Sequence, residues 1–274
     1  MYTEYQPSHL LVHYIDSYWE FKGNPDYGMR IHILPDGCTD FIFTLGEVAN
    51  AVEEGSLIMQ PYRSYFVGPM TKYSELVTYT ESIHMFGVRF LPCGLSCFTN
   101  LPLHEFVNSR VSTNEMKAVF DDTFIEKLGE QKHVTDRIRV VEEYLLAYLA
   151  RHYQPADSHV AMAVNMINHS KGKRSVRSLM DDVCLCQRHF ERKFKHYTGF
   201  TPKEYSRIVK FKNAVELLRT TTSANLLTTA VDAGYYDLAH FSKEIKSMSG
   251  NTPASFLSLT VPEETTLTYI EPQR

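Results

Sequence analysis

Apolar residues in the second half of the chain recur at helical spacing. Phe190 and Phe194 lie four positions apart, with Tyr197 one turn further on, so the three side chains share one face of a helix. Gly199 follows as a residue that can adopt the left-handed conformation that ends a helix. After Phe200, residues 201–204 (Thr-Pro-Lys-Glu) have the order of a capping box with proline at the first helical position. The pattern therefore predicts two helices separated by a short break near Gly199.

The same pattern occurs a second time, 51 residues later. Residues 188–205 and 239–256 are identical at six of 18 positions, which indicates a duplicated supersecondary unit. Each copy is preceded by a shorter amphipathic segment, at 175–183 and at 226–234. A helix, a tight turn and a second helix with a polar outer face are typical of a helix-turn-helix motif. The sequence predicts two such motifs, joined by a longer helix over about 202–219.

The first half of the chain alternates apolar and polar residues at strand spacing. Short strands are predicted near 31–33, 41–45, 65–67, 76–80 and 83–90, with turn signals at 34–37 and 68–69. From about Asn114 the pattern becomes helical, and an apolar seam runs from Val134 to Tyr148 in steps of four and three. Two interpretations of this seam stay open: a contact inside the domain, which we favour, and a dimer contact.

These patterns predict an α+β fold with two domains. The first is β-rich with helices at its C-terminal side, and the second is all-α. We expect the β-rich domain over 1–153, a linker over 154–158, the helical domain over 159–260 and a tail over 261–274.

Charge is distributed unevenly between the two predicted domains. The chain has a net charge of −4, but residues 1–156 carry 12 Lys and Arg against 20 Asp and Glu, whereas residues 157–260 carry 15 against 9. A basic domain beside an acidic one indicates that the helical half binds a polyanion. The alternative is a solvated basic face without a partner.

The outer face of the predicted helix after residue 186 carries side chains that can read DNA bases. Arg188, Arg192 and Lys195 recur at i, i+4 and i+7, opposite the phenylalanines, and Gln187 and Glu191 flank them. Arginine and glutamine can bond guanine and adenine edges, and glutamate can accept from cytosine. Further cations suit phosphate contacts: Lys193, Lys195, Lys203, Arg207, Lys210, Lys212 and Lys246.

Over about residues 157–260 the sequence resembles the AraC/XylS-type transcription regulators. The resemblance is carried by the segments 186–195, 198–202, 234–241 and 249–253. It implies a seven-helix domain whose two recognition helices enter successive major grooves. It also implies that Arg188 and Arg192 read bases in the first motif, together with four positions of the second: Leu238, Ala239, Ser242 and Lys243.

Several positions depart from the family pattern. Cys184 stands where the turn usually has glycine, and Cys186 stands where the cap is usually serine. Leu238 and Ala239 can touch a thymine methyl group but cannot read a hydrogen-bond pattern. We therefore expect the first motif to dominate specificity. The repeated His189 and His240 are expected to pack or cap.

Residues 3–110 resemble the N-terminal β-rich domain of a less characterised subset of these regulators. The matching segments are 5–7, 18–20, 34–40, 67–69 and 87–94. In better-known relatives a barrel-like domain at this place binds an effector, dimerises or does both. For a ligand pocket the best polar-tipped residues among the strands are Trp19, His32, Tyr73 and Arg89.

Other function classes lack support in the sequence. Nucleophile-elbow, P-loop, dinucleotide-binding and zincin motifs do not occur, and we expect neither an enzyme nor a cofactor. Five cysteines suit reduced thiols in the cytoplasm, and a metal site at Cys93, Cys97 and His104 remains a minor alternative. No apolar run is long enough to cross a membrane, and the first residues do not form a signal peptide.

The sequence thus predicts a cytoplasmic regulator that binds double-stranded DNA, controlled through its N-terminal domain by a small-molecule effector or by homodimerisation. RNA polymerase is a possible further partner for such a regulator. Two alternatives stay open for the N-terminal domain: a catalytic module delivered to DNA, and a dimerisation module that binds no ligand.

Overall fold

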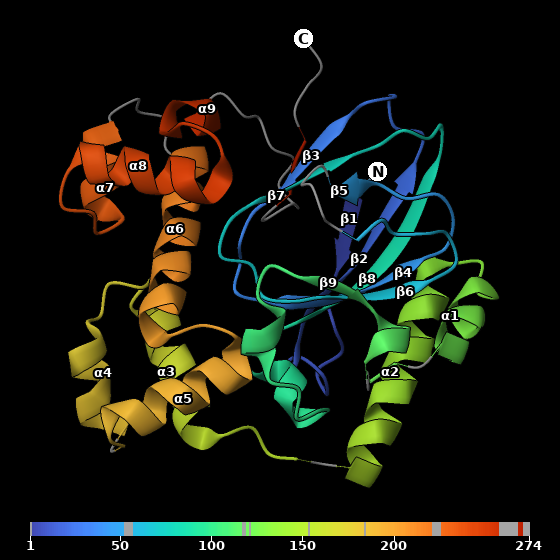
Figure 1. Cartoon of the computed structure of the whole chain (residues 1–274), viewed down its shortest axis with the longest axis horizontal. Helices are drawn as coiled ribbons and strands as arrows, with labels where there is room; N and C mark the ends of the chain where they lie inside the picture. The colour runs from blue at the N-terminus through green and yellow to red at the C-terminus, as the bar shows by residue number, and fades with distance from the viewer. Residues whose placement is uncertain are drawn as a thin grey trace.

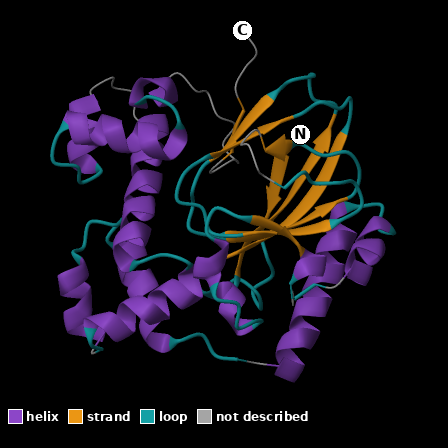
Figure 2. Ribbon diagram, viewed as in Figure 1, coloured by secondary structure: helices purple, strands orange, loops and turns teal. Residues whose placement is uncertain are grey.

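The computed structural model describes residues 2–51, 57–116, 119–120, 122–152, 154–183, 185–220, 226–257 and 268–270. A β-rich lobe and a helical lobe lie side by side (Figure 1). Strands are confined to the first lobe, and two helices cover its outer side, away from the helical lobe (Figure 2). The predicted two-domain α+β fold is confirmed.

The β-rich lobe contains two sheets. A six-stranded sheet has the order β1-β2-β8-β4-β6-β9, and a four-stranded sheet has the order β10-β3-β7-β5; the pairs are antiparallel. The strands are β1 (Tyr2–Tyr5), β2 (Ile15–Gly23), β3 (Arg30–Ile33), β4 (Thr39–Thr44), β5 (Asn50–Ala51), β6 (Ser64–Val67), β7 (Ser74–Val77), β8 (Ile83–Phe90), β9 (Arg110–Ser112) and β10 (Thr268–Ile270).

The predicted strands match β3, β4, β6, β7 and β8, and the predicted turn at 34–37 joins β3 to β4. Strand β2 was not predicted. It pairs with β1 on one side and β8 on the other, and most of its residues are buried on both faces. A strand covered on both faces loses the alternation that identifies strands in a sequence.

The apolar seam at 134–148 belongs to the core of the β-rich lobe. Helices α1 (Asp122–Gly129) and α2 (Val134–His152) follow the strands, later than the helical pattern predicted, since residues 113–115 form only a 3₁₀ turn. Val141 and Leu145 are fully buried against aromatic residues of the sheet, and Ile138 and Tyr148 pack beside them. The interpretation as an intradomain contact is confirmed.

The helical lobe has seven described helices, as the family resemblance implied. They are α3 (Ser158–His169), α4 (Val176–Val183), α5 (Gln187–Thr198), α6 (Pro202–Thr220), α7 (Leu226–Asp232), α8 (Leu238–Ser249) and α9 (Pro253–Leu257). Helices α4 and α5 lie near one end of the long α6, and α7 and α8 lie near its other end (Figure 1).

The predicted caps and termini of these helices are present. Thr201 and Glu204 form a reciprocal capping box, with the Glu204 carboxylate accepting from Thr201 N at 2.7 Å and Thr201 Oγ1 accepting from Glu204 N at 3.2 Å. Gly199 and Gly250 end α5 and α8 with φ of 83° and 76°, in the left-handed region. Asp237, which was not predicted, caps α8 by accepting from His240 N at 2.7 Å.

The two lobes pack closely along the β3–β4 turn. Leu34, from the β-rich lobe, is 1% exposed and belongs to the hydrophobic core of the helical lobe. Gly37 has φ of 86°, and a Cβ atom at this position would lie 2.7 Å from the Tyr205 ring of α6. Lys212 of α6 donates to the carbonyl of Asp36 at 3.3 Å. The turn therefore holds α6 against the β-rich lobe.

Candidate nucleic-acid interface and sensor pockets

The first helix pair presents the predicted reading residues on its outer face. Ser175 Oγ accepts from Ser178 N at 3.1 Å at the start of α4, and Phe190 and Phe194 bury the inner face of α5. Arg188 and Arg192 are exposed on the opposite face. Beside them Gln187 donates to Glu191 at 2.9 Å, so these two side chains are hydrogen-bonded to one another in the DNA-free protein. Cys184 lies outside the described residues.

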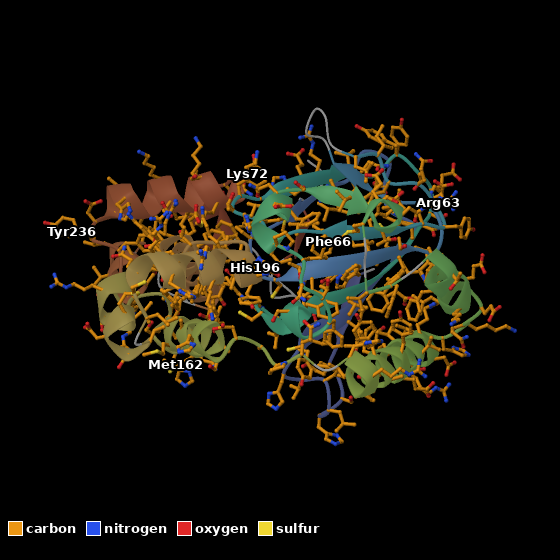
Figure 3. All side chains as sticks on the ribbon, turned by 60° about the horizontal axis from the view of Figure 1, so that its bottom comes forward. Arg63, Phe66, Lys72, Met162, His196 and Tyr236 are labelled. Carbon is orange, nitrogen blue, oxygen red and sulfur yellow. The ribbon has the colours of Figure 1, made fainter. Side chains whose placement is uncertain are left out.

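The second helix pair presents a different surface. Leu238 and Ala239 are exposed at the start of α8, Lys243 is exposed one turn further on, and Ser242 is half-buried. Tyr236, in the turn before α8, is 93% exposed and projects from the far end of the helical lobe (Figure 3). The sequence reasoning missed this residue, because a tyrosine in a turn carries no helical periodicity.

A basic cleft of about 620 Å³ lies between the two motifs. Three of the predicted phosphate-binding residues line it: Lys203, Arg207 and Lys210 of α6. Lys173, Arg174 and the exposed His240 also line the cleft, and the sequence reasoning did not single out the first two. A concentration of cations between two reading helices suits a phosphate backbone that passes from one groove to the next.

Two of the cleft cations are held by groups of the second motif. Arg207 pairs with Glu244 of α8 at 2.7 Å, and this bond is the main cause of the raised pKa of Arg207. Lys210 donates to the carbonyl of Gly234 at 3.2 Å, and burial lowers its pKa. These contacts fix the distance between α6 and the second motif.

The other predicted phosphate residues differ in their surroundings. Lys195 and Lys246 are exposed on α5 and α8. Lys193 instead pairs at 2.5 Å with Asp157, the residue that caps α3, and Lys212 points to the β3–β4 turn. Both therefore make contacts within the chain.

Of the four predicted pocket residues, Trp19 and Arg89 line one pocket in the β-rich lobe. Its wall is apolar, and it encloses about 50 Å³. Trp19 Nε1 donates to Asp40 at 2.7 Å, and the buried Arg89 guanidinium lies 3.2–3.4 Å from oxygens of Glu4, Asp36 and Asp40. Burial raises the pKa of Asp40 to about 6, although Arg89 opposes the shift.

His32 and Tyr73 lie elsewhere, with their rings stacked at 5.4 Å. Tyr73 contacts the helical lobe, since a Cβ atom on Gly250 would lie 2.7 Å from its ring. The sequence could not separate these two residues from Trp19 and Arg89, because all four are polar-tipped residues among apolar strands. The acidic partners Asp36 and Asp40 were missed, since their role depends on Arg89, which is distant in the sequence.

The last turn of α5 contacts the β-rich lobe, where His196 lies at the junction of the two lobes (Figure 3). Its ring lies 6.5 Å from that of His104, and its pKa is lowered by burial and then by His104. Within the described ranges no three His, Cys, Asp or Glu side chains are placed to hold a metal ion, Cys93, Cys97 and His104 included. No helix in the described part of the chain is long and apolar enough to span a bilayer.

Each half of the chain matches a known domain family. Residues 179–258 match a helix-turn-helix domain family, and residues 3–112 match a domain family of unknown function. The match covers both helix pairs of the helical lobe. The chain carries an AraC-type helix-turn-helix domain. This match supports a role for the chain as a DNA-binding transcription regulator. A search of curated protein sequences finds no match.

Solved structures with the same two-domain fold come from Vibrio cholerae. A ToxT structure at 1.65 Å is 9% identical, with a TM-score of 0.52, over 88% of this chain and 98% of its own. ToxT bound to (E)-4-(8-methylnaphthalen-1-yl)but-3-enoic acid is 10% identical, with a TM-score of 0.50 and the same coverage. The C-terminal domain of the Geobacillus stearothermophilus response regulator AraT is 20% identical, with a TM-score of 0.36, over 40% of this chain and 92% of its own.

Proposed function

We propose that the chain binds a specific DNA site through both helix-turn-helix motifs of the AraC-type domain, which we place at residues 159–260. Arg188 and Arg192 would read bases from α5, with Gln187 and Glu191 beside them. Leu238, Ala239, Ser242 and Lys243 would meet the second groove from α8. The cleft cations Lys203, Arg207 and Lys210, with Lys195 and Lys246 on the reading helices, would bind phosphates.

The observation that carries this proposal is the spacing of the two motifs along α6. Its 19 residues correspond to about 28 Å of helix, close to the roughly 34 Å turn of DNA that separates successive exposures of the major groove. The basic cleft lies between the motifs, where the intervening DNA backbone would pass. We include Lys193 and Lys212 only as phosphate ligands that would first have to leave Asp157 and Asp36.

We further propose that the β-rich lobe, residues 1–153, controls DNA binding through a small-molecule effector or through homodimerisation. The last turn of α5 contacts a 3₁₀ turn of that lobe (Leu103–Phe106), and Tyr73 of that lobe lies against Gly250 at the end of α8. A shift of the lobe would therefore move both reading helices. A ToxT structure contains a bound carboxylic acid, which supports small-molecule control in a protein of this fold.

Selection of bound fragments from random DNA by the full-length protein tests the proposal. We expect one enriched asymmetric site with two elements about one helical turn, roughly 10 base pairs, apart. Binding that stays non-specific across effector candidates and salt concentrations would refute sequence-specific recognition.

Two variants then separate base reading from phosphate binding. Arg188→Ala is expected to cost about 1–3 kcal/mol on the selected site and to relax the preference at one base. Lys203→Ala is expected to weaken selected and random DNA alike and to reduce the salt dependence by about one counterion. Equal losses on random DNA for both variants would contradict this division of roles.

A further inference from the structure

One loop of the β-rich lobe contacts both reading helices. Residues 68–73 join β6 of the six-stranded sheet to β7 of the four-stranded sheet. At one end of this loop, a Cβ atom on Gly199 would lie 2.5 Å from Pro69 Cγ, and at the other end a Cβ atom on Gly250 would lie 2.7 Å from the Tyr73 ring. The loop thus meets the C-terminal caps of α5 and α8, which are equivalent positions of the duplicated unit.

Tyr73 is anchored on its own lobe. Its ring stacks on that of the buried His32 of β3 at 5.4 Å, with an angle of 9° between the two planes. Its hydroxyl end then reaches α8, because the atoms nearest to a Cβ position on Gly250 are Cζ at 2.7 Å and the hydroxyl oxygen at 2.9 Å. The side chain also packs against the hydrophobic core of the helical lobe. Tyr73 therefore links a strand of one lobe to a reading helix of the other.

The middle of the loop is held by Asn108. The side-chain oxygen of Asn108 accepts from Thr71 N at 2.8 Å, and its side-chain nitrogen donates to Thr71 Oγ1 at 2.8 Å. The backbone N–H of Asn108 donates to the carbonyl of Pro69 at 2.9 Å. Asn108 closely follows the 3₁₀ turn (Leu103–Phe106) that contacts α5. These bonds join the loop to that turn, so a displacement of the loop would act on both helices.

The contacted ends of the two helices lie opposite the ends that would read DNA. Arg188 lies in the first turn of α5 and Leu238 begins α8, whereas the loop meets the C-terminal caps. Each helix has 12 residues and is therefore about 18 Å long. A tilt of about 10° at the loop would move the reading end by about 3 Å, close to the rise of one base pair. A small change at the loop would thus alter the distance between the two groups of base-reading side chains.

We propose that Pro69 and Tyr73 are positioning residues that set the spacing of the two DNA elements the protein selects. Helix α6 joins the two motifs, and the loop fixes the tilt of both reading helices at the ends away from DNA. Holding both helices in advance lowers the ordering cost of binding to a site with the matching spacing, and it penalises a site with any other spacing. This inference deepens the proposed function and rests on it for the consequence at DNA.

Hydrogen exchange of the free, full-length protein tests the loop contacts without DNA. Tyr73→Ala is expected to speed exchange in the last turn of α8, and Pro69→Ala in the last turn of α5. Asn108→Gly changes neither contact residue, yet it should speed exchange at both places. It removes the side-chain bonds to the loop, and glycine tolerates the φ of 57° at this position. Tyr79→Ala, at a position that is 62% exposed and outside the loop, is the control and should leave both turns unchanged.

Binding to a series of DNA spacers tests the consequence at DNA. The two elements of the selected site are moved one or two base pairs closer together or further apart, and each element is also tested alone. For the parent we expect a change of one base pair to weaken binding by about tenfold or more. For Tyr73→Ala we expect this penalty to fall to about threefold or less, with each single element bound as by the parent. Tyr73→Phe keeps the ring against Gly250 and should restore the parent profile.

Three results would overturn the proposal: unchanged exchange at α5 and α8 in the loop variants, an unchanged spacer profile for Tyr73→Ala, or loss of its binding to single elements, which would show that Tyr73 only supports folding. Failure of the selection experiment is distinguishable from these. It would refute the two-element recognition of the proposed function and the spacing role with it, whereas the exchange experiment would still show whether the loop holds both helices.

Discussion

Leu34→Ala tests how strongly the β-rich lobe supports the helical lobe. Leu34 is 1% exposed and packs in the core of the helical lobe, although it lies in the β3–β4 turn of the other lobe. Burial of a leucine side chain contributes about 1.5–3 kcal/mol, and the cavity left in a core raises the usual cost of Leu→Ala to about 2–5 kcal/mol. A site between two lobes can partly close, so we expect a loss of about 2–3 kcal/mol.

The chain provides a separate probe for each lobe. Trp19 is the single tryptophan and lies in the β-rich lobe, whereas most helical residues lie in the other lobe. In denaturant, tryptophan fluorescence thus follows the β-rich lobe and far-UV circular dichroism mainly follows the helical lobe. For the parent protein we expect the two transitions to coincide. For Leu34→Ala we expect the circular dichroism transition to move to lower denaturant, ahead of the fluorescence transition.

Two control variants complete the test. Leu10 is 54% exposed, and Leu10→Ala should change stability by less than about 0.5 kcal/mol. Leu11 is fully buried in the β-rich core, and Leu11→Ala should move the fluorescence transition first. The reasoning is refuted if Leu34→Ala behaves like Leu10→Ala, or if it moves the fluorescence transition as Leu11→Ala does.

Two more changes have defined outcomes. Thr201→Ala removes one half of the capping box with Glu204 and should cost about 1 kcal/mol in urea unfolding followed by circular dichroism; an unchanged midpoint would show that the box contributes nothing. The folded-state pKa of His196 is lowered by burial and by His104, so the folded state binds a proton less readily than the unfolded state. Stability should therefore fall as pH drops below about 6.5, and the Tm of His196→Gln should fall less over that window; parallel pH profiles would contradict this.

Local signals made the helical lobe predictable. The capping box at Thr201, the terminating Gly199 and the phenylalanine spacing of α5 depend only on neighbouring residues. The duplication repeated the four-residue apolar spacing in α8, as Phe241 and Ile245, together with the terminating glycine and the Thr-Pro pair at the start of α9. The spacing also predicted the apolar seam on α2, although only the structure decided between packing inside the domain and a dimer contact.

Contacts between distant segments were not predictable in the same way. The pairing of Arg89 with Asp36 and Asp40, and the entry of Leu34 into the helical core, join residues that lie far apart in the chain. The sequence identified the turn at 34–37 and Arg89 as a pocket candidate, but it gave no sign of the partner that each would contact.

The reading helices at the two ends of α6 expose different side chains, so the proposed protein–DNA complex has a defined orientation. At one end α5 exposes arginines, and at the other α8 begins with Leu238 and Ala239. If both helices read bases as proposed, the two halves of the DNA site could not be exchanged. Inverting the DNA site would place the β-rich lobe on the opposite flank of that site. A single bound chain would thus have one defined orientation relative to a nearby gene. The orientation of the DNA site would decide which neighbouring DNA-bound proteins the β-rich lobe can contact.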